Sequence, residues 1–136
     1  NNLLQCEMVN KSPILQYSTD VRLMKGVKRL GTLDNGMVVH TWFWNVEGKK
    51  LGPKYNEQQF GGGIDNTSLS AVGLLTSEVK KMYPEAVVIN RDGFEQINEK
   101  ELIQKDEFIR NLIKARKIDG ASSCTRVVGT KFRLCF

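Results

Sequence analysis

The strongest hydrophobic pattern of the chain lies between Asn98 and Ile118, where neither glycine nor proline interrupts the sequence. Side chains at three- and four-residue spacing form one stripe there: Leu102, Ile109, Leu112, Ile113 and Arg116. This spacing predicts a long amphipathic helix towards the C-terminus. The stripe is too narrow and too broken to indicate a coiled coil, because Lys105 and Asp106 interrupt its first heptad. Such a helix would pack equally well against a sheet or inside a trimer.

A second helical pattern follows Asp20, a residue type that favours the N-cap position. Three apolar residues recur at helical spacing after it, namely Val21, Met24 and Val27. The pattern predicts a short N-terminal helix from Asp20 through Leu30, which Gly31 would end.

Short runs of β-branched and aromatic residues predict strands, and turn-forming residues separate them. The expected strands are Met37 to Val46, Ala71 to Leu75, Ala86 to Ile89 and Phe94 to Ile97, with a final hairpin in Cys124 to Phe136. Trp42 and Trp44 should share one face of the first strand, because side chains alternate along a strand. A central short helix from Thr76 to Met82 should follow the second strand and stop before Pro84.

These elements predict one small α+β domain with small sheets or hairpins, in keeping with 136 residues of which 40% are hydrophobic. Residues 1–18 show no clear period, and we expect them to be a lead-in from an upstream part of the protein. The segment Glu47 to Asn66 holds five glycines and one proline, which predicts a long loop or connector. No apolar run approaches the roughly 20 residues that span a bilayer, and the first residues lack the features of a signal peptide, so we expect a soluble chain.

Charge and cysteine content add little specific chemistry. The net charge of +5 would suit a polyanionic partner if it gathered on one face, yet basic residues are dispersed among acids and aromatic residues do not interleave with them. We therefore expect no nucleic acid partner. The three cysteines lack CxxC spacing, so free thiols are expected. The single histidine, His40, and the run Gly61 to Gly63 match no metal or phosphate motif, so no metal or cofactor is expected.

Four segments carry motifs in a definite order: Thr19 to Lys28, Asn35 to Trp42, Val72 to Val79 and Tyr83 to Val87. The first begins Thr-Asp-Val-Arg-Leu, and the last two are Val-Gly-Leu-Leu-Thr-Ser-Glu-Val and Tyr-Pro-Glu-Ala-Val. Asp92-Gly93-Phe94 and Leu102 continue the order. This series resembles the intramolecular chaperone auto-processing family, whose members end phage tail fibres, tailspikes and endosialidases. The resemblance covers about residues 19–118 and depends on the order of the motifs rather than on any one of them.

The resemblance implies a chaperone domain at residues 19–118 followed by a C-terminal hairpin or tail at residues 119–136. It implies an intertwined homotrimer that promotes the trimerisation and folding of an upstream fibre or spike, with the long helix and a Gly-rich arm at residues 56–68 contacting neighbouring chains. The implied location is a virion tail fibre or spike that folds in the host cytoplasm. An alternative is a receptor-binding tip, in which Trp42, Trp44 or the C-terminal hairpin contacts a host surface receptor.

In active members of the family, the hydroxyl of the opening serine attacks the carbonyl before it, and a lysine five residues later acts as base. Thr19 and Met24 stand at these positions, and a thioether is a poor proton acceptor. Lys25 is one residue out of register, which is about 100 degrees around a helix. The candidate catalytic residues that the resemblance implies are Thr19, Asp20, Lys25 and Glu78. The resemblance thus implies a serine-type endopeptidase with impaired self-cleavage, and an active domain that cuts before Thr19 is the alternative.

Overall fold

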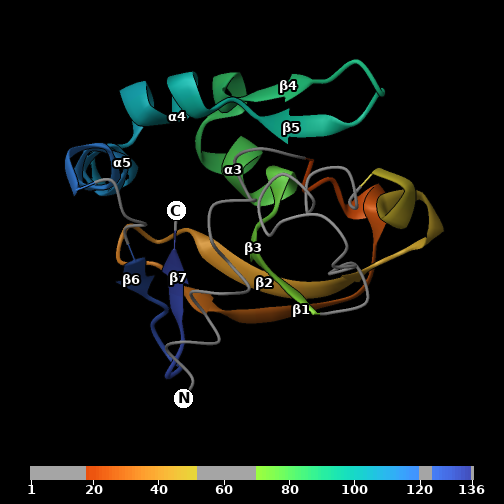
Figure 1. Cartoon of the computed structure of the whole chain (residues 1–136), viewed down its shortest axis with the longest axis horizontal. Helices are drawn as coiled ribbons and strands as arrows, with labels where there is room; N and C mark the ends of the chain where they lie inside the picture. The colour runs from red at the N-terminus through yellow and green to blue at the C-terminus, as the bar shows by residue number, and fades with distance from the viewer. Residues whose placement is uncertain (1–17, 52–69, 120–123, 136) are drawn as a thin grey trace.

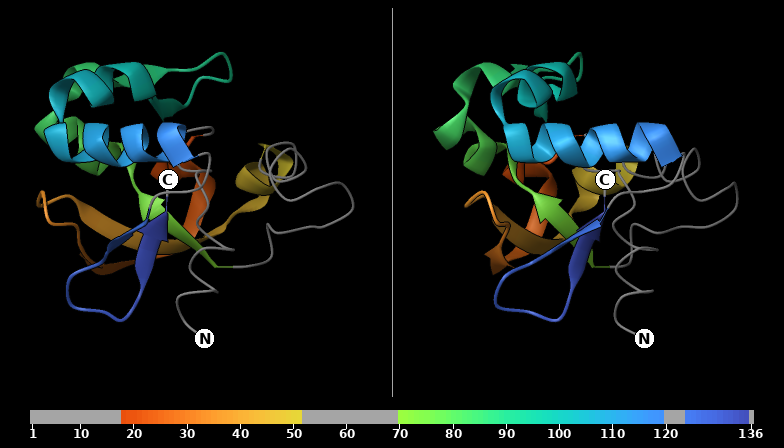
Figure 2. Two further views of the ribbon diagram at one scale, coloured as in Figure 1. Left: turned by 60° about the vertical axis from the view of Figure 1, so that its left-hand side comes forward. Right: turned by 90° about the vertical axis from the view of Figure 1, so that its left-hand side faces the viewer.

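The structure, a computed structural model, describes residues 18–51, 70–119 and 124–135. Its centre is an antiparallel sheet of three strands in the order β1 (Met24–Thr32), β2 (Val38–Trp44) and β3 (Ala71–Leu74). Helices α3 (Thr76–Met82), α4 (Glu99–Lys105) and α5 (Glu107–Asp119) lie on one side of this sheet (Figures 1 and 2). The predicted α+β class is confirmed.

Two hairpins complete the described part of the chain. One consists of β4 (Val87–Ile89) and β5 (Glu95–Ile97), follows the short 3₁₀ helix η3 (Pro84–Ala86), and lies beside α4 and above α3 in Figure 1. The other consists of β6 (Cys124–Arg126) and β7 (Arg133–Cys135) and is joined to the end of β1. Both hairpins, the strands β2 and β3, and the central helix α3 agree with the sequence prediction.

Two hydrophobic clusters hold these elements together. The larger one joins the sheet to α3, α4, α5 and the last hairpin, and includes Leu33, Val39, Leu74, Val79, Leu102, Ile109, Ile113, Val127 and Leu134. The smaller one consists of Leu23, Met24, Trp42, Trp44 and Leu75. Val39 and Trp42 belong to different clusters because alternating side chains place them on opposite faces of β2. Trp42 and Trp44 share one face as predicted, and their rings meet edge to face with centroids 5.7 Å apart.

The predicted N-terminal helix from Asp20 to Leu30 is wrong. A single 3₁₀ turn, η2 (Val21–Leu23), is followed at once by strand β1, which pairs with β2 from Met24 opposite Trp44 to Thr32 opposite Val38. Val21 and Val27, which the helical spacing placed on a buried face, are 44% and 39% exposed. Pairing with the next strand, β2, therefore outweighs a weak local period.

Gly31 likewise does not end a helix but lies within β1, beside one of its two bulges. A Cβ atom at this position would clash with the carbonyl oxygen of Val128 in the C-terminal hairpin. Thr32 and Val128 exchange backbone hydrogen bonds at 3.4 and 2.7 Å. The glycine thus allows the hairpin to approach the sheet closely.

The predicted single long helix is also wrong, because it breaks at Asp106 into α4 and α5. Asp106 has an extended backbone, with φ −118° and ψ 113°, and its carboxylate accepts a hydrogen bond from the amide of Ile109 at 2.9 Å. It therefore acts as the N-cap of α5. The same carboxylate accepts hydrogen bonds from the hydroxyl of Tyr83 and the side-chain amide of Asn35 at 2.8 and 3.1 Å.

Several expectations fall wholly or partly outside the described residues. They concern the lead-in at 1–17, the Gly-rich arm at 56–68 and most of the connector at 47–66. The first residues of this connector, 47–51, belong to a helix that begins at residue 46. Cys124 is disulfide-bonded, so the expectation of three free thiols is wrong for this cysteine. Within the described ranges, no helix is long and apolar enough to cross a membrane.

Candidate functional site

The segment Ser18 to Asp20 is buried between α3 and β5, and its three residues are 5%, 0% and 3% exposed. The carbonyl of Thr19 accepts a hydrogen bond of 3.3 Å from the backbone amide of Thr76, the first residue of α3. The hydroxyl of Ser18 donates to the carbonyl of Glu95 on β5 at 2.5 Å and accepts from the amide of Asp20 at 3.2 Å. These bonds fix the backbone on both sides of the Ser18–Thr19 peptide.

Asp20 is the most highly connected group of this segment. Its Oδ1 caps η2 by accepting from the backbone amide of Arg22 at 2.9 Å, while its Oδ2 accepts from the backbone amide of Glu95 at the same distance. The Arg22 guanidinium adds an ion pair, with Nη2 2.8 Å from Oδ2. The guanidinium also donates to the carbonyl of Gly93 at 3.1 Å and lies 4.9 Å from the ring centroid of Phe94.

These contacts set the ionisation of Asp20. Burial alone would raise its pKa, but hydrogen bonds from the Arg22 side chain and from the backbone amides of Glu95 and Arg22 outweigh that effect. The pKa of Asp20 therefore lies below its ordinary value, and the side chain is a carboxylate at neutral pH. A carboxylate held in this way is a structural anion rather than a proton donor.

A second polar chain links α3 to β5. The hydroxyl of Thr76 is 3.3 Å from Oε1 of Glu95 and 3.5 Å from the carbonyl oxygen of Thr19. Oε2 of Glu95 forms an ion pair with Nζ of Lys80 at 2.8 Å. Glu95 thus contacts the candidate segment through its amide, its carbonyl and, by way of Thr76, its carboxylate.

The side-chain hydroxyl of Thr19 differs from its neighbours because, within the described part of the chain, it is buried without a hydrogen-bond partner. Most buried hydroxyl groups in proteins are hydrogen-bonded, so such an exception requires an explanation. A nucleophilic hydroxyl needs a base within about 3 Å to take its proton. No described group holds that position at Thr19.

The other two candidate catalytic residues lie elsewhere. Lys25 is exposed on β1 opposite Phe43, and Met24 beside it is buried in the smaller cluster. Glu78 pairs with Lys81 at 3.1 Å on the surface of α3. The structure therefore unites Thr19 and Asp20 but leaves Lys25 and Glu78 in separate interactions.

Sequence reasoning missed Thr76, Lys80 and Glu95 as members of this site. The motif Val72 to Val79 contains Thr76, yet nothing in its spacing indicates a hydrogen bond to Thr19. Glu95 is a single acid in a short strand, and its contacts depend on the way the β4–β5 hairpin packs over α3. The adjacent motif Asp92-Gly93-Phe94 was the only local sign that this hairpin matters.

His40 lies in β2 between Arg29 of β1 and Gly73 of β3. Burial is the largest influence on its pKa, which is lowered from the ordinary value, and its Nδ1 is buried without a hydrogen-bond partner among the described residues. Those residues contain no group of three or more His, Cys, Asp or Glu side chains placed to hold a metal ion.

Comparison of the chain with protein-family models, with curated proteins and with solved structures finds no match in any of the three.

Proposed function

We propose that this chain is a C-terminal intramolecular chaperone domain that promotes the trimerisation and folding of a phage tail fibre or tailspike. Its self-cleavage is impaired, so the domain stays attached as a cap. The single observation that carries the proposal is that separate motifs of the resemblance meet at one buried site. Thr19 comes from the first motif, Thr76 from the third, and Glu95 directly follows Asp92-Gly93-Phe94.

The meeting of these motifs supports the proposal because each alone has an ordinary structural explanation. Asp20 would serve as a helix cap in any protein, and the segment from Gly73 to Val79 would form a strand and helix junction without special chemistry. Neither explanation requires the two segments to be hydrogen-bonded to each other and to β5. A shared site gives these segments a common structural role.

A chaperone role also has a clear physical purpose. Trimeric β-rich fibres depend on contacts between chains, and such non-local pairing folds slowly and exposes aggregation-prone edges. A compact domain that associates early raises the effective concentration of the strands that precede it. Exposed apolar side chains suited to such association lie on α3 and β4, where Met82, Val88 and Ile89 are 41%, 42% and 65% exposed.

The surroundings of Thr19 support impaired cleavage. Cleavage would form an ester between its Oγ1 and the carbonyl carbon of Ser18 as the Ser18–Thr19 amide bond breaks, with the hydroxyl proton passing to the new amine, and water would then hydrolyse the ester. The required base is missing among the described groups, because Lys25 is exposed on β1 and Met24 occupies the core. Thr19 therefore keeps the position of the nucleophile without its activation.

The test is the mass and oligomeric state of a chain that carries its native upstream sequence, measured by intact mass spectrometry and light scattering. A trimer of uncut chains is expected. A trimer cut before Thr19 would restore the self-cleaving alternative, and an uncut monomer would contradict the assembly role. Thr19→Val is the matched control, because it removes only a hydroxyl that makes no hydrogen bond to any described residue and should change stability by less than about 1 kcal/mol.

The receptor-binding alternative needs one correction. Trp42 and Trp44 are only 2% and 3% exposed, so they are core residues and not ligand contacts. The C-terminal hairpin, in contrast, exposes Val128 and Phe132 by 43% and 39%.

A disulfide at Cys124 is unusual for folding in a reducing cytoplasm and would form after the virion leaves the cell.

A further inference from the structure

The basic residues that are dispersed along the sequence are segregated in the fold. Residues 76–119, which form the helices and the β4–β5 hairpin, carry nine acidic and nine basic residues. The strands β1 to β3 and the hairpin at 124–135 carry no acidic residue and six basic ones, namely Lys25, Lys28, Arg29, Arg126, Lys131 and Arg133. The net positive charge of the described residues is thus concentrated in the β layer.

Strand register gathers part of this charge on one face of the sheet. Lys25 is paired with Phe43, and Lys28 is paired with Thr41. Phe43 and Thr41 are two residues apart on β2, so they and their partners project from the same face. Arg29 is paired with His40 and projects from the other face. The two basic residues of β1 that lie on the same face as Phe43 are therefore Lys25 and Lys28.

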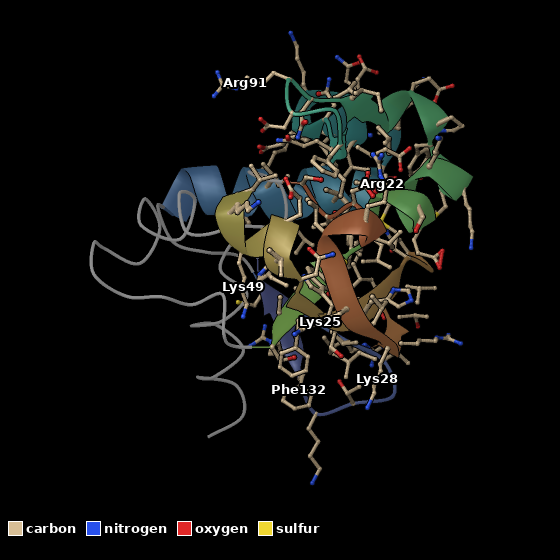
Figure 3. The ribbon with its side chains drawn as sticks, turned by 90° about the vertical axis from the view of Figure 1, so that its right-hand side faces the viewer. Arg22, Lys25, Lys28, Lys49, Arg91 and Phe132 are labelled. Atoms are coloured by element: carbon tan, nitrogen blue, oxygen red, sulfur yellow. The ribbon has the colours of Figure 1, made fainter. Side chains whose placement is uncertain are left out.

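The C-terminal hairpin adds an aromatic ring to this surface. Val39 is on the same face of β2 as Phe43, and its partner on β1 is Gly31. Gly31 lies against Val127 and Val128 of the hairpin. The hairpin therefore covers the Val39 end of this face. Figure 3 shows Lys25, Lys28 and Phe132 together on one side of the molecule. Phe43 and Phe132 are 45% and 39% exposed. We call Lys25, Lys28, Phe43 and Phe132 the Lys–Phe face.

The arginines near the Lys–Phe face are already engaged. Arg126 forms an ion pair with Asp34 at 3.0 Å, and Arg133 donates to the carbonyl of Cys124 at 3.2 Å. Lys25 and Lys28 are exposed and form no ion pair with any described residue. Lysines on an edge strand protect it against pairing with other chains, but that role does not explain two exposed phenyl rings beside them.

We propose that the Lys–Phe face binds an acidic polysaccharide. Lysine ammonium groups are point charges that match single carboxylate or sulfate groups, and exposed phenyl rings match the apolar faces of sugar rings. Nucleic acid fits less well, because bidentate recognition of phosphate uses arginine, and here the arginines are paired or lie on the opposite face. A second copy of the same face would be repelled by its own lysines.

This inference deepens the proposed function, since it assigns a ligand class to the fibre end, and it depends on that function only for its biological setting. The face is built within one chain, so its binding can be measured whatever the oligomeric state. Light scattering tests assembly, and ligand titration tests the face. Either can fail without the other.

The experiment is fluorescence anisotropy with a labelled octagalacturonate at low ionic strength, compared with neutral maltooctaose and with a thymidine oligonucleotide of the same charge as the octagalacturonate. Only octagalacturonate should bind well, and Lys25→Gln and Lys28→Gln should each lower the slope of log affinity against log salt by about one unit. Phe43→Ser should weaken binding about fivefold with an unchanged salt slope. Lys114→Gln, an exposed lysine of α5, is the matched control and should have no effect.

Three results would overturn the proposal. An equal loss of octagalacturonate affinity in Lys114→Gln and Lys25→Gln would show that binding follows the overall charge of the protein. Tighter binding of the oligonucleotide would make the face a nucleic acid site. A lack of octagalacturonate binding at low salt would leave the lysines as edge protection alone.

Discussion

Replacement of Asp20 by asparagine tests whether the site at Thr19 is a structural unit of the fold. The side chain is 4% exposed, and its two oxygens serve different partners: Oδ1 accepts from the Arg22 amide and Oδ2 from the Glu95 amide. Asparagine has the same shape but only one acceptor oxygen. Whichever way the amide group turns, one backbone N–H then faces an NH₂ group instead of an acceptor.

The magnitude follows from these contacts. A buried donor left without a partner costs about 1–3 kcal/mol. Loss of the ion pair adds little, because the Arg22 side chain is 59% exposed and solvent screens its charge. Asp20→Asn should therefore lower the free energy of unfolding by about 1–3 kcal/mol, an appreciable part of the roughly 5–15 kcal/mol typical of a domain.

Urea denaturation at a fixed protein concentration measures this difference, since association would make apparent stability depend on concentration. The matched control is Asp92→Asn in the exposed β4–β5 turn, with an expected change within about 0.5 kcal/mol. Because the pKa of Asp20 is lowered in the fold, its contribution is present above the ordinary value of 3.8 and is lost as pH falls through the lowered value. The variant should lack this acid-dependent loss. Equal unfolding midpoints for Asp20→Asn and Asp92→Asn would refute the reasoning.

Two further predictions concern Asp106 and His40. Asp106→Ala removes the N-cap of α5 and the acceptor for Tyr83, so stability should fall by about 2–3 kcal/mol. The pKa of Tyr83, which the Asp106 hydrogen bond raises, should fall towards 10.0 in a spectrophotometric titration, and an unchanged titration would contradict that pairing. Burial lowers the pKa of His40, so the fold disfavours its protonation, and stability should decrease as pH falls below the ordinary value of 6.5. His40→Gln should flatten this part of the pH profile of urea midpoints, and an unaltered profile would exclude His40 as its source.

Local signals predicted the elements that depend on neighbours in sequence. The turn at Asp34-Asn35-Gly36 and the β-branched and aromatic residues that follow it were sufficient to predict strand β2. Gly36 adopts φ 89° in this turn. Pro84 was sufficient to stop α3, since proline cannot continue a helix. In such cases the conformational preference and the tertiary contacts favour the same structure.

Local signals failed where distant partners decide the structure. Nothing near Asp106 predicts that its carboxylate meets Tyr83 and Asn35, yet these contacts stabilise the break between α4 and α5. The error at β1 has a different cause, because there a weak 3.6-residue period after Asp20 was overridden by pairing with the neighbouring strand β2. The candidate site divides in the same way: Thr19 and Asp20 followed from the motif, whereas Glu95 required the packing of the hairpin over α3.

The segregation of charge constrains how the proposed trimer can form. Around a threefold axis, equivalent surfaces of three chains come close together, so Lys–Phe faces turned towards the axis would bring the Lys25 and Lys28 side chains of the three chains near one another. Met82, Val88 and Ile89 lie on α3 and β4, which belong to the part of the chain where acidic and basic residues balance. Association through exposed apolar side chains of this part, such as Ile89, would bury them without like-charge repulsion and would leave the β layer facing outwards. Assembly and ligand binding would then use different sides of the same domain, so Ile89→Lys should disrupt the trimer while leaving octagalacturonate binding intact.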